Sequence, residues 1–248
     1  MIKLDHITKT YSNEVRAVND FSMEVGDGEI VGFIGPNGAG KTTSIKMMTG
    51  ILKPDSGKVL INDFDMQDNP LEAKKIIGYI SDSPDMFLRL TGIEFINFMA
   101  DIYDVPEEGR REKIEGLASR FDLMDALDKQ MQGYSHGMRQ KMMVIACLVH
   151  EPLVWILDEP LTGLDPKSAF VLKNMMREHA DKGNSVLFST HVLEVAEKLC
   201  DRIVVINHGE ALFTGTLEEL TGRYPGMDLE KIFLEMTGAE LESEMSVN

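Results

Sequence analysis

The sequence is short of cysteine and of long apolar runs. Its 248 residues contain two cysteines, Cys147 and Cys200. They have no paired spacing and lie in apolar surroundings, so we expect reduced thiols in a cytoplasmic protein and no disulfide framework. The longest strictly apolar runs, such as residues 153–157, are far too short to cross a bilayer, and residues 1–6 contain no apolar signal core. The sequence therefore predicts a soluble chain that would reach a membrane only through a partner.

Positive charge is also scarce. The chain has 25 Lys and Arg against 41 Asp and Glu, which gives a net charge of −16. A body this acidic repels the phosphates of nucleic acids, so we expect no nucleic-acid partner. What the sequence does have is an ordinary globular composition, with 43% hydrophobic and 27% charged residues. Its length suits one large core or a core with a small subdomain.

A glycine-rich stretch carries the strongest chemical signal. Residues 35–43 match G-x-x-x-x-G-K-[ST], the phosphate-binding loop. Its glycines let the backbone curl so that successive N–H groups point at phosphate oxygens, and the helix expected near Lys41 adds the positive end of its dipole. Lys41 would reach the β- and γ-phosphates, and the Thr42 hydroxyl would ligate Mg²⁺. The candidate nucleotide-binding residues here are Gly35, Pro36, Asn37, Gly38, Ala39, Gly40, Lys41, Thr42 and Thr43.

The flanking sequence favours this interpretation over a glycine-rich turn with an incidental lysine. Residues 29–34 form a short apolar run that predicts a buried strand entering the loop. Residues 44–49 predict a helix leaving it, and Gly50 is placed to end that helix. Strand, loop and helix in this order are the setting that a phosphate-binding loop requires.

A second apolar run ends in two carboxylates. Residues 154–157 predict a strand, and Asp158 and Glu159 follow it. At the carboxyl end of a parallel strand beside the phosphate loop, Asp158 can hold the Mg²⁺ shell and Glu159 can polarise the attacking water. A lone apolar run followed by two acids is usually only the end of a strand. Together with the phosphate loop, it indicates a catalytic site.

Strand and helix patterns organise the rest of the chain. Residues 1–30 predict antiparallel strands, because apolar and polar residues alternate there. From about 85 to 150 the patterns are helical, with a capping box at Thr91 and an N-cap at Ser135. Further strands are expected at 58–61, 76–80, 185–189 and 202–206, with a hairpin at 207–214. Further helices are expected at 70–75, 110–121, 193–199 and 229–236, and two more begin at residue 166 and at Thr216. Residues 240–248 are expected to fray. Continuous apolar strands that alternate with helices predict a parallel sheet covered on both faces.

The segment Tyr134-Ser135-His136-Gly137-Met138-Arg139-Gln140 completes a resemblance to the ATP-binding subunits of ABC transporters. The resemblance extends from residue 1 to about residue 238. The segment resembles the family signature, usually Leu-Ser-Gly-Gly-x-x-Gln. In that family the signature lies at a helix N-terminus and binds the γ-phosphate of ATP held by the other subunit. The resemblance therefore implies that Ser135, Gly137 and Gln140 bind nucleotide across a dimer.

Three further positions match motifs of the same family. Asp165, in residues 163–165, matches a loop that crosses the dimer interface. His191, in residues 189–191, matches a switch histidine that contacts the γ-phosphate, and Tyr11 matches an aromatic residue that stacks on adenine. A lone Tyr or His in a turn is more often structural. Here, however, five family motifs follow one another in the family's order.

Two positions depart from the family pattern. Asp82 stands where the family has a glutamine that touches Mg²⁺ or water and couples to the membrane subunit. Asp82 can accept a hydrogen bond from metal-bound water, so it is a candidate metal and catalytic residue, although it cannot donate. His136 replaces the first signature glycine. A backbone of positive φ there would cost about 1–2 kcal/mol and weaken ATP affinity or slow hydrolysis. A second hypothesis is that the His136 ring adds a hydrogen-bond donor to the γ-phosphate.

The resemblance implies an α/β fold with a P-loop NTPase core, in which a mostly parallel sheet is flanked by helices. An N-terminal antiparallel β subdomain and an inserted α-helical signature subdomain complete it. The whole chain would form a single ABC ATPase domain. Residues 1–81 and 151–220 would make the catalytic core, residues 82–150 the helical subdomain, and residues 221–248 a C-terminal helix and tail.

The implied function is ATP hydrolysis with Mg²⁺ by a head-to-tail homodimer, or by a heterodimer with a related ATPase. A separately encoded integral membrane permease would hold the dimer at the inner face of the cell membrane. Residues 229–238 resemble the tail of ATPases that serve drug, bacteriocin and polysaccharide-type exporters, which favours export over import. Two alternatives stay open: a soluble ABC-type ATPase outside transport, and a weakly hydrolysing regulatory subunit, suggested by Asp82 and His136. A nucleotide kinase shares the loop but would not need residues 135–140 or His191.

Overall fold

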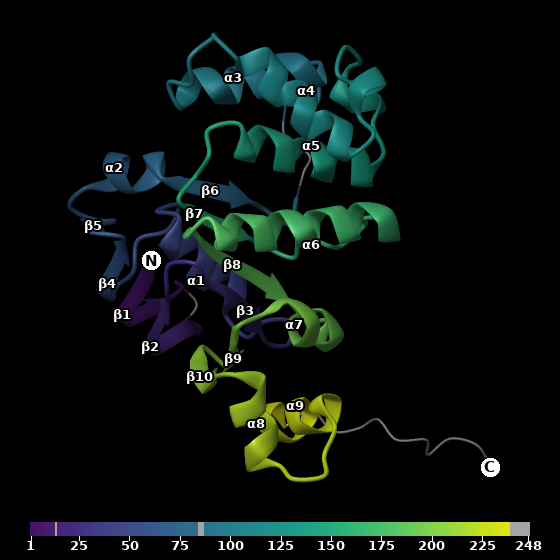
Figure 1. The fold of residues 1–248 in the computed structure, drawn as a ribbon. Coiled ribbons are helices and arrows are strands. Elements are labelled where there is room, and N and C mark those ends of the chain that lie inside the picture. The colour runs from purple at the N-terminus through teal and green to yellow at the C-terminus, as the bar shows by residue number, and fades with distance from the viewer. Residues whose placement is uncertain (13, 84–86, 239–248) are drawn as a thin grey trace.

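The computed structural model describes residues 1–12, 14–83 and 87–238, and its larger sheet is mostly parallel (Figure 1). This sheet has six strands in the order β10-β9-β3-β8-β7-β6. Only β10 runs antiparallel to its neighbour, at one edge. The strands are β3 (Ile30–Ile34), β6 (Ile77–Ile80), β7 (Val154–Leu157), β8 (Ser185–Thr190), β9 (Arg202–Asn207) and β10 (Glu210–Gly215).

Alternate side chains of this sheet enter two different cores. Trp155 and Leu157 of β7 pack with apolar residues of the helices that follow residue 92. Val154 and Ile156 of the same strand pack with α1 (Lys41–Met48) and with the smaller sheet. Every residue of β7 is therefore buried, as expected for a parallel strand covered on both faces. The prediction of a two-sided parallel sheet is confirmed.

The smaller sheet is antiparallel, as the alternation near the N-terminus predicts. Its strands lie in the order β2-β1-β4-β5. In β2, Phe21, Met23 and Val25 are buried while Ser22 and Glu24 are exposed, so only one face meets the core. The strands are β1 (Ile2–Thr10), β2 (Arg16–Val25), β4 (Ser56–Ile61) and β5 (Phe64–Asp65).

The helices cover the larger sheet and build a separate lobe. α3, α4 and α5 lie together beyond the edge of the sheet, at the top of Figure 1, and we call them the helical lobe. The capping boxes at Thr91 and Thr216 and the N-cap at Ser135 are present, so these local predictions are confirmed. The helices are α1 (Lys41–Met48), α2 (Pro70–Lys75), α3 (Gly92–Ile102), α4 (Arg110–Arg120), α5 (His136–Leu148), α6 (Pro166–Asp181), α7 (Leu193–Leu199), α8 (Leu217–Arg223) and α9 (Leu229–Thr237), with 3₁₀ turns at Met124–Ala126 and Met131–Gly133.

The last helix, α9, lies at the opposite end of the molecule from the helical lobe (Figure 1). Within this helix Ile232 is fully buried, while Leu229, Phe233 and Met236 pack at the rim of the same cluster. The helix covers one end of the fold and has neighbours on one side only, which leaves the rim residues partly exposed. The predicted fraying of residues 240–248 lies outside the described residues.

The structure also bears on the expectations drawn from the two cysteines and from the lack of long apolar runs. Cys147 is buried, Cys200 is partly buried, and both are free thiols. Burial raises the pKa of both thiols, that of Cys200 to about 12, so both are protonated at neutral pH. Within residues 1–12, 14–83 and 87–238, no helix combines the length and the apolar character that crossing a bilayer demands.

Candidate functional site

A cavity of about 240 Å³ lies beside the loop that joins β3 to α1. Residues 36–43 supply most of its lining, and Ala17, Asp82, Asp158 and Glu159 supply the rest. The carboxyl ends of parallel strands meet at one edge of a sheet, so β3, β6 and β7 deliver residues distant in sequence to the same place. The structure therefore unites the predicted phosphate loop, the two strand-end acids and Asp82 in one cavity.

The shape of the loop requires glycine at two positions. Gly40 has a φ of +108°, and a Cβ there would lie 2.5 Å from the carbonyl oxygen of Ala17. A Cβ at Gly35 would collide with the carbonyl oxygen of Ile206. The loop backbone is thus packed against its surroundings more closely than a side chain permits. This packing holds its amide groups around the cavity.

Lys41 projects into the same loop and is 7% exposed. Its Nζ donates to the carbonyl oxygens of Gly35 at 2.6 Å and Pro36 at 3.2 Å, and lies 4.0 Å from Glu159 Oε1. Burial lowers the pKa of Lys41, whereas the charges of Glu159 and Asp158 act in the opposite direction. Phosphate oxygens would be stronger acceptors than these neutral carbonyls. Lys41 and the first turn of α1 can therefore hold phosphate.

Asp158 fits a divalent cation. It is 1% exposed, and its Oδ1 accepts a hydrogen bond of 2.6 Å from Ser189 Oγ. Its Oδ2 is buried without a hydrogen-bond partner among the described residues, and Thr42 and Asp82 line the same cavity. The described residues hold no cluster of three His, Cys, Asp or Glu that could bind a metal by itself. One buried carboxylate with a hydroxyl nearby suits Mg²⁺, which keeps waters and takes further ligands from phosphate.

Burial raises the pKa of Asp158, and the charges of Asp82 and Glu159 add to that rise, while the hydroxyls of Ser189 and Thr42 oppose it. Since the folded state binds this proton more readily than the unfolded state, the ionised Asp158 costs stability once the pH exceeds the ordinary pKa of an aspartate, about 3.9. We expect Asp158→Asn to raise the free energy of unfolding at pH 7 by about 1 kcal/mol, or roughly 2–4 °C in Tm. The gain should shrink as pH falls towards 4.

Thermal unfolding of both proteins between pH 4 and pH 8 measures this difference. Asp165→Asn is the matched control, because hydrogen bonds from Ser168 lower the pKa of Asp165 and the same substitution there brings no gain at pH 7. A Tm gain for Asp158→Asn that is equally large at pH 4 and pH 8 would contradict the assignment of a destabilising charge.

Glu159 sits at a constrained turn directly after β7. It has a φ of +48°, and its backbone N–H donates to Ser189 Oγ at 2.9 Å. Its Oε2 accepts from His191 Nδ1 at 3.0 Å, so the switch histidine and the strand-end acid predicted from separate motifs are in contact. A carboxylate held by a histidine on one side and within reach of Lys41 on the other can orient and deprotonate a water.

Ser189 is a functional residue that the sequence analysis did not single out. Its hydroxyl donates to Asp158 and accepts from the Glu159 amide, so one side chain fixes both acids. Ser189 is fully buried near the end of β8, which pairs with β7. A polar residue near the end of an otherwise apolar strand, beside the strand that carries the acids, was the available signal.

Tyr11 lies in the turn after β1 and is 41% exposed. Its hydroxyl is 3.5 Å from Thr43 Oγ1, which brings the ring next to the end of the phosphate loop. An exposed aromatic ring in this position offers a face to a planar base. The structure therefore brings Tyr11 to the loop, as a base-stacking residue requires.

Seven predicted residues do not line this cavity. Tyr11, Gly35 and His191 contact residues that line it. The other four lie on α5 or at the start of α6: Ser135, Gly137, Gln140 and Asp165. Ser135 is exposed and caps α5, accepting from the Met138 amide at 3.3 Å. Asp165 is exposed and caps α6 through Ser168. Gln140 is 1% exposed, and its Nε2 donates to the Pro160 carbonyl oxygen at 3.4 Å, so within this chain it connects α5 to the segment after Glu159.

The expected strain at His136 is absent. His136 is the first residue of α5 and does not have a positive φ. A right-handed helical residue has no penalty for carrying a side chain, so the proposed cost of replacing glycine does not arise. This correction removes strain as a reason to expect slow hydrolysis.

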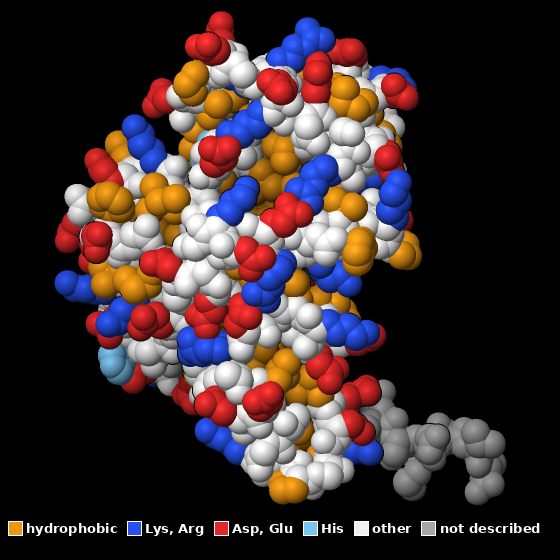
Figure 2. All heavy atoms as spheres, viewed as in Figure 1, with side chains coloured by type: hydrophobic (Ala, Val, Ile, Leu, Met, Phe, Trp, Pro, Cys, Tyr) orange, Lys and Arg blue, Asp and Glu red, His pale blue; other side chains and the backbone are white. Residues whose placement is uncertain are grey.

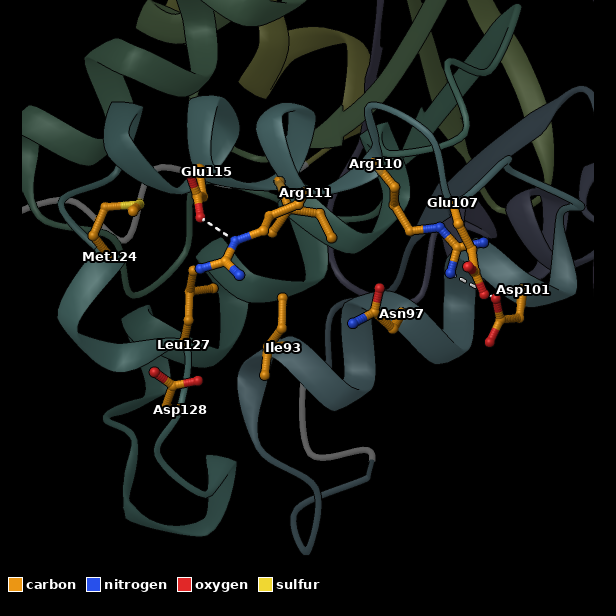
Figure 3. A pocket seen from close by; sticks show the side chains of 11 residues that line it. Ile93, Asn97, Asp101, Glu107, Arg110, Arg111, Glu115, Met124, Leu127 and Asp128 are labelled. Carbon is orange, nitrogen blue, oxygen red and sulfur yellow. Dashed lines mark hydrogen bonds and ion pairs between the residues drawn. The ribbon is translucent and has the colours of Figure 1, made fainter.

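A larger cavity, of about 610 Å³, lies within the helical lobe (Figure 3). Its basic residues face acids within the same cavity, since Arg110 pairs with Asp101 at 2.6 Å and Arg111 pairs with Glu115 at 2.8 Å. It has no loop of inward-pointing amides. Its chemistry is therefore unsuited to a triphosphate, and the smaller cavity at the phosphate loop is the candidate site.

Comparison with known proteins decides which family uses this arrangement. A family model described as ABC transporter matches residues 18–162, which include the phosphate loop, the signature-like segment and both strand-end acids. The chain belongs to the ATP-binding subunits of ABC transporters. This ABC ATPase therefore binds and hydrolyses ATP, and the nucleotide-kinase alternative is excluded.

Curated relatives agree with this assignment. The ABC ATPase is 33% identical to the ABC transporter ATP-binding protein NatA of Bacillus subtilis, over 94% of this chain and 97% of NatA. It is 36% identical to the daunorubicin/doxorubicin resistance ATP-binding protein DrrA of Streptomyces peucetius, over 88% of this chain and 66% of DrrA. Both relatives are ATP-binding proteins, so the ABC ATPase is the ATP-binding part of a transport system.

Solved structures share the fold. The structure of an ATP-binding subunit of an ABC transporter superimposes with a TM-score of 0.90 and 31% identity, covering 95% of this chain and 99% of that chain. The dimeric structure of MJ0796, a bacterial ABC transporter cassette, superimposes with a TM-score of 0.80 and 25% identity, covering 88% of this chain and 99% of that chain. The α/β ABC ATPase fold predicted from the sequence is therefore confirmed.

Proposed function

We propose that two copies of this ABC ATPase pair head to tail, hydrolyse ATP with Mg²⁺ between them, and power export through a separately encoded membrane permease. One observation supports the proposed dimer. The phosphate cavity and the exposed signature segment belong to the same chain, yet residues 134–140 contribute nothing to that cavity. A triphosphate held by Lys41 would keep its γ-phosphate accessible from outside. A second chain can supply what is missing.

Within one chain, the phosphate loop and Lys41 bind the phosphates while Tyr11 stacks on the base. Thr42, Asp158 and Asp82 are the residues that would hold Mg²⁺, which neutralises charge on the phosphates when bound. Glu159 accepts a proton from the attacking water, and His191 holds the Glu159 carboxylate in place. Support comes from the distances between these side chains and from the orphaned Oδ2 of Asp158.

Across the pair, α5 of one chain would face the γ-phosphate of the other. Its 13 residues give a helix whose exposed N-terminus, at Ser135, offers a hydroxyl and free amides to an anion. Gly137 allows close approach in the same turn, and Asp165 lies at the start of α6. The similarity to a dimeric cassette supports this pairing. A homodimer satisfies the geometry, as would a heterodimer with a related ATPase.

The proposed permease contact is an exposed apolar surface, here called the Phe98 patch, formed by Phe87, Phe98 and Ile102. Their exposed fractions are 41%, 41% and 55%, and the rings of Phe87 and Phe98 lie 5.3 Å apart. In the view of Figure 2, hydrophobic side chains lie between charged ones on the surface over the helical lobe. The patch is close in sequence to Asp82, which lines the nucleotide cavity. A membrane protein bound here would sense the nucleotide and hold the ATPase at the cytoplasmic face of the membrane.

Replacing Phe98 with Ser tests this contact. Since a central aromatic anchor dominates many interfaces, we expect affinity for membranes from the encoding cells to fall by about tenfold. Turnover of the isolated chain should stay within about twofold, because Phe98 does not line the nucleotide cavity. Co-sedimentation with those membranes and phosphate release measure the two quantities. The matched control is Phe170→Ser, on α6, where the parent side chain is 61% exposed. Unchanged sedimentation of Phe98→Ser would refute the docking surface.

The export direction has its own support. The C-terminal helix α9 and the residues around it resemble the tails of exporter ATPases, and DrrA is named for resistance to a drug. We also propose that residues 1–81 and 151–220 act as the catalytic core, residues 82–150 as the helical subdomain, and residues 221–248 as an appended helix and tail. Steady ATP turnover together with membrane binding would separate this function from a soluble ATPase and from a weakly hydrolysing regulatory subunit.

A further inference from the structure

We propose that His136 is a positioning residue that holds the segment carrying Glu159 against α5. The ring of His136 packs on the backbone of Gly163: a Cβ built on Gly163 would lie 3.0 Å from the ring Nε2 and closer still to Cδ2. Gly163 has a φ of +77° and no side chain, so the ring fills the space that a side chain would take. His136 therefore sets the separation between the start of α5 and residues 159–165.

The rest of the first turn of α5 touches the same segment. A Cβ on Gly137 would lie 2.8 Å from the carbonyl oxygen of Gly163, so the two backbones are in contact there. One turn later, Gln140 Nε2 donates to the carbonyl oxygen of Pro160, the residue after Glu159. Positions i, i+1 and i+4 share one face of a helix. This face of α5 is the support on which residues 159–165 rest.

Residues 159–165 need such a support because they have little structure of their own. The segment has two backbone hydrogen bonds within it, Thr162 N to Glu159 O at 3.2 Å and Leu164 N to Leu161 O at 3.3 Å. At its first residue, Glu159, the backbone has a φ of +48° and the carboxylate meets His191. A small displacement of the segment would move the Glu159 carboxylate relative to the water it activates, which lowers the rate more than it changes nucleotide binding.

The contact with Gly163 depends on the shape of the His136 ring and not on its charge. The ring atom nearest to a Cβ built on Gly163 is a carbon, Cδ2, and Nε2 lies farther from that position, at 3.0 Å. A flat ring without nitrogens would make the same contact. A hydrogen-bond donor to the γ-phosphate, by contrast, would need the nitrogens. His136→Phe and His136→Gln therefore separate the two roles, because the first keeps the ring and the second keeps a donor.

The expected results are specific. His136→Gly and His136→Gln should each lower kcat by about fivefold, with the KM for ATP within about twofold of the parent. His136→Phe should retain at least about half of the parent kcat and the same dependence on pH between 6 and 8. Loss of activity in His136→Phe with retention in His136→Gln would overturn the positioning role in favour of a donor. Parent-like kcat in His136→Gly would overturn both.

A double-mutant cycle with Gly163→Ala tests the contact itself. In the parent background the new Cβ collides with His136, and the φ of +77° adds strain. In the His136→Gly background the space is free and only the strain remains. We expect Gly163→Ala to lower kcat at least about threefold more in the parent than in the His136→Gly background. Equal effects in the two backgrounds would overturn the inference. Tm values identify any variant that fails to fold. If a Gly163→Ala protein does not fold, the comparison of kcat between His136→Phe and His136→Gly tests the positioning role by itself.

The role of His136 depends on the proposed function, since it acts through Glu159. The two can fail separately. If Glu159→Gln leaves turnover unchanged, the proposed catalytic site is wrong. If turnover depends on Glu159 but the cycle is additive, only the positioning role of His136 is wrong.

Discussion

Glu159→Gln lowers ATP turnover by about two to three orders of magnitude and leaves ATP bound, if Glu159 is the general base. Gln has the same shape and can still face His191, but it cannot accept the proton of the attacking water. The substitution also removes a negative charge that lies 4.0 Å from Lys41, next to the place of the γ-phosphate. Repulsion between the site and ATP falls, so the closed pair should persist.

Phosphate release and gel filtration with ATP and Mg²⁺ measure the two outcomes. The parent chain should elute mainly as a monomer after turnover, whereas Glu159→Gln should elute as a dimer that contains ATP. Glu235→Gln, on the exposed face of α9, is the matched control and should behave as the parent. A Glu159→Gln protein that hydrolyses ATP at the parent rate would remove Glu159 as the base.

Two inactive variants restore activity when they form a mixed pair. Lys41→Ala removes the phosphate-binding charge, and Ser135→Asp places a negative charge at the start of α5, where the partner's γ-phosphate would lie. Asp caps a helix as well as Ser does, so α5 should stay folded. In a head-to-tail pair each site takes Lys41 from one chain and Ser135 from the other. A mixed pair therefore has one intact site and one site with both defects.

The expected magnitudes follow from counting sites. Each variant alone should retain less than about 1% of parent turnover. An isolated mixed pair, co-expressed with two different tags, should recover about half of it, because one of its two sites is intact. Ser135→Asn, which keeps the cap without the charge, is the control and should keep most of the activity. No recovery in the mixed pair would mean that Ser135 does not act on the nucleotide of the other chain.

Local sequence patterns predicted the elements of the fold well. The strand at Val154–Leu157 and the helices at Pro70–Lys75 and Leu193–Leu199 have the bounds that the sequence indicates. Each is set by short-range physics, namely an apolar run, a proline at the helix start, or apolar residues at helical spacing. The phosphate loop is local in the same sense, because consecutive amides and one lysine bind the same group.

Local sequence patterns could not predict contacts between segments that are distant in the chain. Ser189 fixes Asp158 and Glu159 from the neighbouring strand, and its polar position near a strand end does not by itself reveal these two partners. Gln140 matched a nucleotide-binding motif, yet its side chain is buried against Pro160. His136 replaced a glycine in a motif, and only the fold reveals that its ring lies on Gly163 without backbone strain.

The sequence by itself determined the phosphate loop, the two acids at a strand end, the order of strands and helices, and the family. These depend on spacing along the chain, which governs backbone conformation over a few residues. Only the tertiary structure decided which side chains meet: Glu159 with His191, Ser189 with both acids, and His136 with Gly163. Strand order and the packing of α5 on the segment after β7 determine which residues pair in this way. Neither can be read from the positions of the two partners in the sequence.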